Sequence, residues 1–334
     1  LVIFFTGFGA IAADRENGTL KILLSQGVSW KEILTGKALG LMGIALSVLL
    51  VVIIILFTGC LSIGGNLLSA GSLARIGWLA LSYAVYFGIV CMITVVISAV
   101  CKTARLALVS LIGIWLLCSV ILPRTTQAMG SFLYAAPSRI EFETAIEKDL
   151  VKKGDSHDPN DPYYKALRDS ILKAYKVDSV QQLPFNYSGF QMKQGERISA
   201  TIYNQHLLSL LKTYEQQNMV SRLSAFINPF AALRNISMAI SGTDFNAYTS
   251  FQAQAEDYRY RLAQHMNDLQ IKLIGKEKLS ISRAYWKEFP DFEYKGAAAG
   301  AVLKGELISL VALLFWAIVL LMLINVLSKR LKAI

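Results

Sequence analysis

Long apolar runs and polar stretches divide the chain into segments of two kinds. Three apolar runs lie within residues 38–122 and a fourth lies within 304–334, and each is long enough to cross a membrane as a helix. The polar region 123–303 carries charges of both signs and shows no sustained strand alternation. The pattern predicts an all-α membrane protein of polytopic transmembrane helices, with an α-helical domain inserted before the last span. We expect the spans at about 38–60, 76–101, 106–122 and 307–327.

A further apolar run stands at the start, at residues 1–13. Thirteen residues are too few to span a hydrocarbon core of about 30 Å. No initiator methionine and no basic region precede them, so the run does not have the pattern of a signal peptide. We interpret it as the end of a truncated transmembrane helix, and we expect the chain to be a fragment that lacks at least part of one upstream span.

Lysine and arginine concentrate in the loops on one side of the predicted spans. The loop at 61–75 carries Arg75 alone. The loops of the other side and the C-terminal tail hold Arg15, Lys21, Lys31, Lys37, Lys102, Arg105, Lys329, Arg330 and Lys332. Because short basic loops stay in the cytoplasm while long domains translocate regardless of charge, residues 14–37 and the tail are predicted to be cytoplasmic. The domain at 123–303 is then extracytoplasmic.

Composition sets the class of partner. The 334 residues have a mean hydropathy of +0.46 and a net charge of +10. A basic balance can indicate nucleic-acid binding. Here the basic residues flank apolar runs, so we expect the partner to be a lipid bilayer and not a nucleic acid. The four cysteines lie in or at the ends of apolar runs, which favours small buried side chains over a disulfide framework.

The stretch Asp14–Lys37 carries seven charges between two uncharged apolar segments. Its sequence predicts a short helix, a stop and a second helix. Thr19 is placed to cap the first turn of the short helix, and Gly27 to end it in a left-handed conformation. Ser29 with Glu32 three residues later predicts a capping box for the next helix.

Leu20, Leu23 and Leu24 fall on one face of that short helix and form an apolar stripe. At a membrane face the stripe needs a cover, either lipid or a partner protein. The segments Glu16-Asn17-Gly18-Thr19-Leu20, Leu23-Leu24-Ser25, Ser29 and Gly36-Lys37 resemble the E-x-G-T-L…LLS…K loop of ABC-2 type transporter permeases.

In that family the loop forms a coupling helix, which docks into a groove on a cytoplasmic ATPase. The resemblance therefore implies three partners: an ABC ATPase subunit, a second permease copy or paralogue that completes a dimer, and the bilayer. ATP and Mg would bind the partner ATPase, with no cofactor, metal or catalytic residue in this chain. The residues assigned to ATPase coupling are Glu16, Gly18, Thr19, Leu20, Leu23 and Leu24. The alternative is an ordinary cytoplasmic loop that lies on lipid.

A second pattern comprises Asn228-Pro229-Phe230-Ala231-Ala232-Leu233, Ser241-Gly242-Thr243-Asp244, Phe251 and Tyr258-Arg259. It is similar to the extracytoplasmic domain of one branch of ABC-2 permeases, the multi-copper-enzyme-maturation type, which places a large helical domain before the last transmembrane helix. This resemblance implies a multi-pass protein of the bacterial inner (plasma) membrane. Permeases of this kind have been assigned to copper-enzyme maturation and to export of polysaccharide, lipid or drugs, so the substrate stays open.

Sequence motifs for catalysis are missing. Gly36-Lys37 is followed by Ala38 and lacks the upstream glycine of a Walker A loop, so energy would come from another chain. There is no HExxH or CxxC motif, and His157, His206 and His265 are far apart in the sequence. The spans contain almost no ionisable side chain, which argues against a proton path. Glu306 comes nearest, at an outer boundary, and we expect it to mark the interface.

Local signals predict the helices of the domain at 123–303. Ser138 with Glu141 makes a capping box, Asp161-Pro162 and Asn228-Pro229 open helices, and Gly242 closes one. A helix is expected over about 194–223. The last long helix carries a seam close to a heptad repeat at Phe251, Ala255, Tyr258, Leu262, His265, Leu269 and Leu273.

Aromatic residues stand among charges just before the last span. Trp286, Phe289 and Phe292 are the chief members of this group. Because amphipathic rings sit at the headgroup level of a membrane, we interpret the segment as an interfacial lever along the outer face. The alternative is that the rings complete the core of the domain.

The sequence is compatible with two functions from different classes. The first is the membrane-spanning permease subunit of an ATP-driven transporter. The second is a membrane-anchored sensor or scaffold, whose external domain binds an envelope partner without transport. A membrane enzyme is disfavoured, because the chain shows no catalytic constellation.

Overall fold

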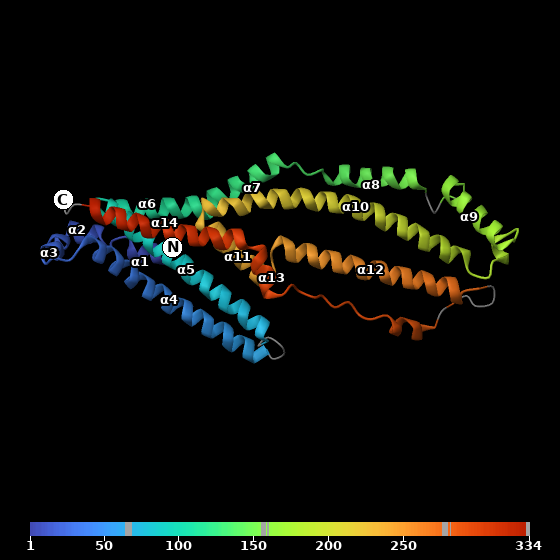
Figure 1. Ribbon diagram of the computed structural model, residues 1–334, viewed down its shortest axis with the longest axis horizontal. Coiled ribbons are helices and arrows are strands. Elements are labelled where there is room, and N and C mark those ends of the chain that lie inside the picture. Colours follow the sequence, from blue (N-terminus) through green and yellow to red (C-terminus); the bar gives the residue numbers. More distant parts are fainter. Residues whose placement is uncertain (64–68, 155–157, 159, 276–279, 281, 332–334) are drawn as a thin grey trace. The chain divides into compact units, whose positions relative to one another are not determined.

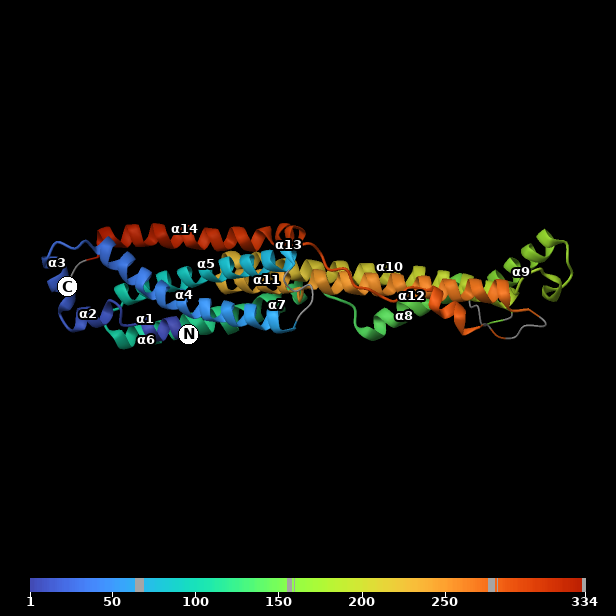
Figure 2. The ribbon, with the colours of Figure 1, turned by 90° about the horizontal axis from the view of Figure 1, so that it is seen from below.

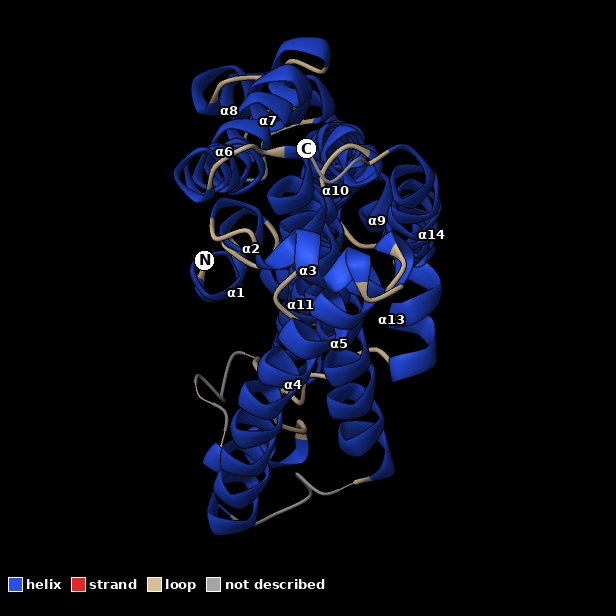
Figure 3. Ribbon diagram, turned by 90° about the vertical axis from the view of Figure 1, so that its left-hand side faces the viewer, coloured by secondary structure: helices blue, strands red, loops and turns tan. Residues whose placement is uncertain are grey.

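The protein is an all-α membrane protein. The computed structural model describes residues 1–63, 69–154, 158, 160–275, 280 and 282–331, and every regular element within those ranges is a helix (Figure 3). Four helical segments are long and apolar enough to cross a membrane: Trp30–Gly59, Ala70–Val100, Ala104–Leu133 and Leu307–Arg330. The predicted fold class and four spans are thus confirmed.

The chain divides into two compact units. The membrane unit comprises Leu1–Leu133, Gln216–Ala247 and Ala297–Ile334, and the polar unit comprises Tyr134–Glu215 and Tyr248–Gly296. Two helices, α10 (Tyr187–Leu223) and α12 (Phe245–Leu273), contribute residues to both units. This division differs from the predicted domain at 123–303, because residues 123–133, 216–247 and 297–303 pack with the membrane spans.

Helix α5 (Ala70–Val100) is the central element of the membrane unit. It contacts α1 (Val2–Gly7), α4 (Trp30–Ile63), α11 (Pro229–Ser241) and α14 (Leu307–Arg330), and Figures 1 and 2 show α4 and α5 side by side. Its inward face consists of small and branched apolar residues, so neighbouring helices approach closely. Its fully buried members include Ile89, Cys91, Val95 and Ala99.

Residues 1–13 do not form one helix. Helix α1 ends at Gly7, and the short α2 (Ala12–Glu16) begins after a turn. The hydroxyl of Ser98 on α5 accepts hydrogen bonds from the backbone of Ile11 and Ala12, both at 3.0 Å, and donates one to the carbonyl of Phe8 at 2.7 Å. One buried side chain therefore satisfies three backbone groups that the helix break leaves without partners.

The prediction that Pro123 ends the third span is wrong. Helix α6 (Ala104–Leu116) continues through the π-helix η2 (Leu117–Ile121) into α7 (Leu122–Leu133). A proline ring clashes with the carbonyl four residues earlier in a regular α-helix. The wider π-turn before Pro123 relieves that clash, so the helix continues.

The π-turn also binds a distant helix. Asn228 is buried with 1% exposure, and its amide donates to the Cys118 carbonyl within the π-helix at 2.7 Å. The same side chain caps α11 by accepting from the Phe230 N–H, with Pro229 at the first helical position. The predicted start of this helix at Asn228-Pro229 is confirmed, as is its end at Gly242, which has φ +72°.

Helix α11 lies in the membrane unit and not with the polar helices. Its apolar face, including Ala232, Ile236 and Ile240, packs in one cluster with Ile89 of α5 and Leu313 of α14. The buried positions of α11 recur every three or four residues, as expected for a helix with one apolar face. Such a face needs a cover, and the spans provide it.

The polar unit is built from α8 (Arg139–Lys153), α9 (Pro162–Tyr175), α12 and most of α10 (Figure 1). The predicted capping box of Ser138 and Glu141 is present in full, and Asp161 caps α9. Helix α10 begins at Tyr187, seven residues before the predicted start at 194. Short 3₁₀ segments complete the unit at η3 (Val180–Gln182) and η5 (Arg283–Glu288).

Helix α8 is attached to α10 by an aromatic contact and a hydrogen bond. The rings of Phe142 and Tyr203 meet edge to face at 6.1 Å, and His206 lies 2.9 Å from Asp149. Hydrogen bonds from Lys152 and His206 hold the pKa of Asp149 below its usual value. His206 therefore helps to hold α8 against α10.

Candidate functional site

The segment α2–α3 is anchored to the end of α5. Helix α3 spans Thr19–Ser25. Arg15 donates to the carbonyls of Ala99 and Cys101, at 2.7 and 2.6 Å, which satisfies groups at the C-terminus of α5. Glu16 accepts from the Ala104 N–H at 3.3 Å, at the start of α6. Because guanidinium and carboxylate complement the two helix ends, this attachment is electrostatically favourable.

An ion pair closes the segment on its other side. Asp14 lies 2.8 Å from Lys37 of α4. The hydroxyl of Thr19 donates back to the Asp14 carbonyl at 3.1 Å. The cap predicted for Thr19 is therefore wrong: Gly18 is the N-cap, with φ +76°, a left-handed conformation that a side chain disfavours. The chain needs this turn at Gly18 to bring α3 back against the bundle.

The predicted helix end at Gly27 and the predicted capping box of Ser29 and Glu32 are confirmed. Gly27 has φ +85°, and the N–H of Val28 donates to the Leu23 carbonyl, which completes a left-handed stop. Ser29 and Glu32 exchange the two hydrogen bonds of a capping box, at 2.8 and 3.3 Å.

The leucine stripe of α3 is covered by the chain itself. Leu20 is 1% exposed and belongs to a core cluster with Leu34 of α4, Val95 of α5 and Ile324 of α14. Leu23 and Leu24 are half-buried and pack against the same cluster. The expectation that this stripe needs lipid or a partner as its cover is therefore corrected, because three spans converge under α3.

The opposite face of α3 is open. Ile22 is 58% exposed, which is unusual for an isoleucine on a helix with a buried side. Exposed polar residues surround it, namely Glu16, Thr19, Lys21, Ser25 and Gln26. Of the six residues assigned to coupling, Glu16 and Thr19 are exposed, Gly18 is half-buried, and the three leucines face inward. We give the name α3 outer face to Ile22 together with the exposed polar residues Glu16, Thr19, Lys21, Ser25 and Gln26.

Sequence reasoning missed a buried polar network around Glu306. Glu306, between α13 (Ala299–Gly305) and α14, is 5% exposed and lies 3.0 Å from Arg222 of α10. Arg222 also donates to the Gly305 carbonyl, and Ser309 donates to Glu306 at 2.8 Å. Asn235 of α11 reaches Ser309 at 3.5 Å. The expectation that Glu306 only marks an interface is wrong, since it is an ion-pair partner inside the unit.

The signal that pointed to this network was the charge itself. An acid directly before an apolar run is rare, because a buried carboxylate needs a cationic or hydrogen-bonding partner. The sequence could not show which arginine supplies it, since Arg222 lies 84 positions earlier along the chain.

The aromatic residues before the last span pack on α12. The ring centroid of Phe289 lies 5.4 Å from those of Tyr258 and His265, and the ring centroid of Phe292 lies 5.8 Å from that of Phe251. Both are contacts within the polar unit. They support the alternative, in which the rings complete a core, rather than the interfacial lever. The side chain of Trp286 lies outside the described residues.

Phe289→Ser is therefore expected to destabilise α12 locally, by about 1–2 kcal/mol, because the ring is half-buried and truncation of a fully buried Phe costs about 3–5 kcal/mol. Hydrogen exchange of the full chain in lipid nanodiscs would show faster exchange at α12. The matched control is Phe132→Ser, because Phe132 is 86% exposed. Unchanged exchange at α12 together with weakened transport would restore the lever interpretation.

Histidine, cysteine and acidic side chains are the possible metal ligands in the described part of the chain. No group of three histidine, cysteine, aspartate or glutamate side chains there is arranged to hold a metal ion. His265 packs on Phe289, and His157 lies outside the described residues. Cys91 and Cys101 are buried, as expected for small apolar residues.

The middle part of the chain is similar to a known family. Residues 139–295 match a family described as a domain of unknown function, DUF3526. The match covers less than half of the chain, and it includes α8 to α12 and η5. No curated protein and no solved structure matches the chain.

Proposed function

We propose that this chain is the permease subunit of an ABC-2 type transporter, in which a separate ATPase binds the α3 outer face. The substrate moves between α-helical spans of two permease chains, this one and a second copy or paralogue. ATP and Mg bind the ATPase. In this arrangement α3 is cytoplasmic and the polar unit is extracytoplasmic in a bacterial plasma membrane.

One observation carries the proposal: α3 has an inner face built into the spans and an outer face left open. Leu20 ties α3 to α4, α5 and α14 at once. Arg15 and Glu16 fix the same segment to the α5–α6 turn. A force applied to the outer face would therefore act directly on three apolar helices, which is what coupling to an ATPase requires.

The residues of the E-x-G-T-L pattern divide between the two faces. Gly18 provides the turn, and the leucines hold α3 in place. Glu16, Thr19 and Ile22 lie where a partner can reach them. An exposed apolar residue ringed by polar ones is a typical anchor of a protein interface. Because the segment resembles ABC-2 coupling loops, we infer that the partner at the α3 outer face is an ATPase.

Ile22→Asp is expected to abolish co-purification of the ATPase from native membranes, because it places a charge at the centre of the docking surface. Insertion and folding should be unchanged, since Ile22 is exposed. The matched control is Ile140→Asp on α8, where isoleucine is 76% exposed but far from α3 in sequence. Mass spectrometry of the purified complex measures the amount of ATPase that co-purifies with each variant.

Wild-type amounts of ATPase with Ile22→Asp would contradict the docking assignment. A wild-type chain that purifies without any ATPase would favour the second candidate, a sensor or scaffold. One observation supports that candidate: the polar unit contains a cavity between α10 and α12.

A further inference from the structure

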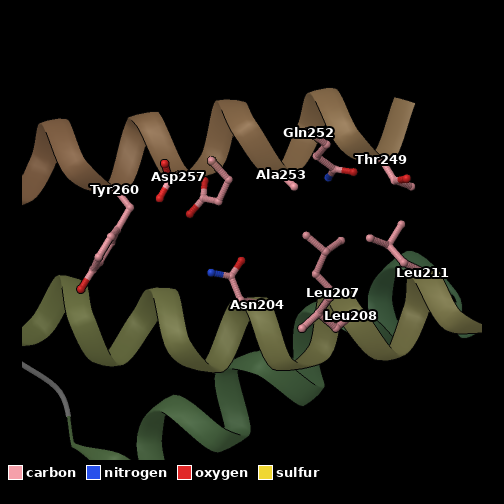
Figure 4. A pocket seen from close by; sticks show the side chains of 10 residues that line it. Asn204, Leu207, Leu208, Leu211, Thr249, Gln252, Ala253, Asp257 and Tyr260 are labelled. Carbon is pink, nitrogen blue, oxygen red and sulfur yellow. The ribbon is translucent and has the colours of Figure 1, made fainter. Parts of the chain in front are cut away.

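A cavity of 310 Å³ lies between α10 and α12 within the polar unit. Figure 4 shows the two helices running past each other with side chains pointing into the space from both. The volume is at the lower end of the range for small-molecule sites. Its lining comprises Asn204, Leu207, Leu208, Leu211, Thr249, Gln252, Ala253, Glu256, Asp257 and Tyr260.

The cavity exists because the two helices are held together at one end. Gly189 of α10 lies against α12 so closely that a Cβ there would be 3.1 Å from the Ile271 backbone nitrogen. Lys193 and Asp268 form an ion pair at 2.6 Å in the same region. Further along, residues 204–211 of α10 and 249–260 of α12 line the cavity.

The lining changes in character along its length. Figure 4 shows Leu207, Leu208 and Leu211 grouped on α10, opposite Ala253 and Thr249 of α12. This part offers an apolar wall for a hydrocarbon chain or ring.

The other part is polar and acidic. Glu256, Asp257, Asn204 and Tyr260 line it, and the lining contains two acids and no lysine or arginine. Arg259 lies outside the lining and bridges Glu256 and Glu196, at 2.8 and 2.7 Å. Hydrogen bonds to these two acids raise the pKa of Arg259, so it stays charged. Arg261, also outside the lining, pairs with Asp257 at 2.9 Å, so these three acids and two arginines together sum to one negative charge.

One acceptor in the cavity has no partner. The side-chain oxygen of Gln252 is buried and accepts no hydrogen bond from any described residue. Leaving a buried polar atom unpaired is unfavourable. A ligand with an N–H group would satisfy it.

We propose that this cavity binds an amphipathic amine, with its apolar body against the leucines and its ammonium group at Gln252 and the acidic end. The acidic lining selects a cation over an anion, and the leucines select an apolar body over a bare ammonium ion. This site is independent of the proposed ATPase docking and lies on the polar unit.

The test uses the full chain in lipid nanodiscs and three water-soluble probes of equal chain length: hexylamine, hexanol and hexanoate. Isothermal titration calorimetry, with empty nanodiscs subtracted, measures binding. Hexylamine should bind at least about tenfold more tightly than hexanol, since the ammonium group contributes a charge-assisted hydrogen bond. Hexanoate should not bind. Equal binding of hexylamine and hexanol would overturn the selection of a cation.

Two variants locate the site. Ala253→Phe fills the cavity and should abolish hexylamine binding, whereas Ala166→Phe, at an exposed alanine of α9, should leave it unchanged. Gln252→Leu keeps the volume but removes the acceptor, and should weaken binding about tenfold. Gln252→Leu also tests the site if the Ala253→Phe variant fails to fold. Wild-type binding by Gln252→Leu, or by a folded Ala253→Phe, would overturn the proposal.

Discussion

Glu306→Ala is expected to lower the free energy of unfolding of the membrane unit by about 3–5 kcal/mol. The substitution removes one partner of an ion pair whose side chains are 14% and 6% exposed, Arg222 and Glu306. The guanidinium then stays buried with its charge uncompensated, and Ser309 loses its acceptor. Thermal unfolding in detergent micelles, followed by intrinsic fluorescence, measures the loss.

The matched control removes both charges at once. Arg222→Met with Glu306→Leu replaces the pair by apolar groups of similar size, which is often neutral or stabilising for buried pairs. The double variant should therefore recover most of the stability that Glu306→Ala loses. Two single losses that simply add in the double variant would show that the residues do not act as a pair.

The local signals of the sequence predicted helix ends well. Ser138 with Glu141, Asp161-Pro162 and Asn228-Pro229 all open helices as expected. Each of these signals depends on residues within one turn of one another, so nothing from the rest of the chain is needed to interpret them. The four apolar spans follow in the same way from the length of each run.

The errors arose where a distant residue changes the local outcome. Pro123 would end a regular α-helix, but a π-turn precedes it, and Asn228 from 110 residues away binds the Cys118 carbonyl of that turn. Helix α11 was assigned to the polar region because it lies there in sequence. Its apolar face could be placed only once α5 and α14 were seen beside it.

The candidate site shows the same division. The sequence identified α3 and its apolar stripe from the spacing of Leu20, Leu23 and Leu24. It could not decide what covers the stripe, since a core of the same chain and a partner present the same apolar chemistry. Arg15, which anchors the segment to the Ala99 and Cys101 carbonyls, was visible only as one of several basic loop residues.

Leu20→Asp is expected to unfold the region around α3 rather than merely release the ATPase. Leu20 is 1% exposed among residues of α4, α5 and α14. Truncation of such a leucine to alanine costs about 2–5 kcal/mol, and a carboxylate in the same place adds the cost of burying an unpaired charge. Ile22→Asp, two positions away on the outer face, should change stability by no more than about 0.5 kcal/mol.

Hydrogen exchange of the full chain in nanodiscs, together with ATPase co-purification, separates the two roles. Leu20→Asp should speed exchange in α3 and in the adjoining part of α4, and it should lose the ATPase as a consequence. Ile22→Asp should lose the ATPase while exchange in α4 stays at the wild-type rate. Leu20→Ala gives an intermediate case, with faster exchange but no added charge. If Leu20→Asp instead exchanges like wild type and only the ATPase is lost, Leu20 faces the partner and the burial of the stripe within this chain is wrong.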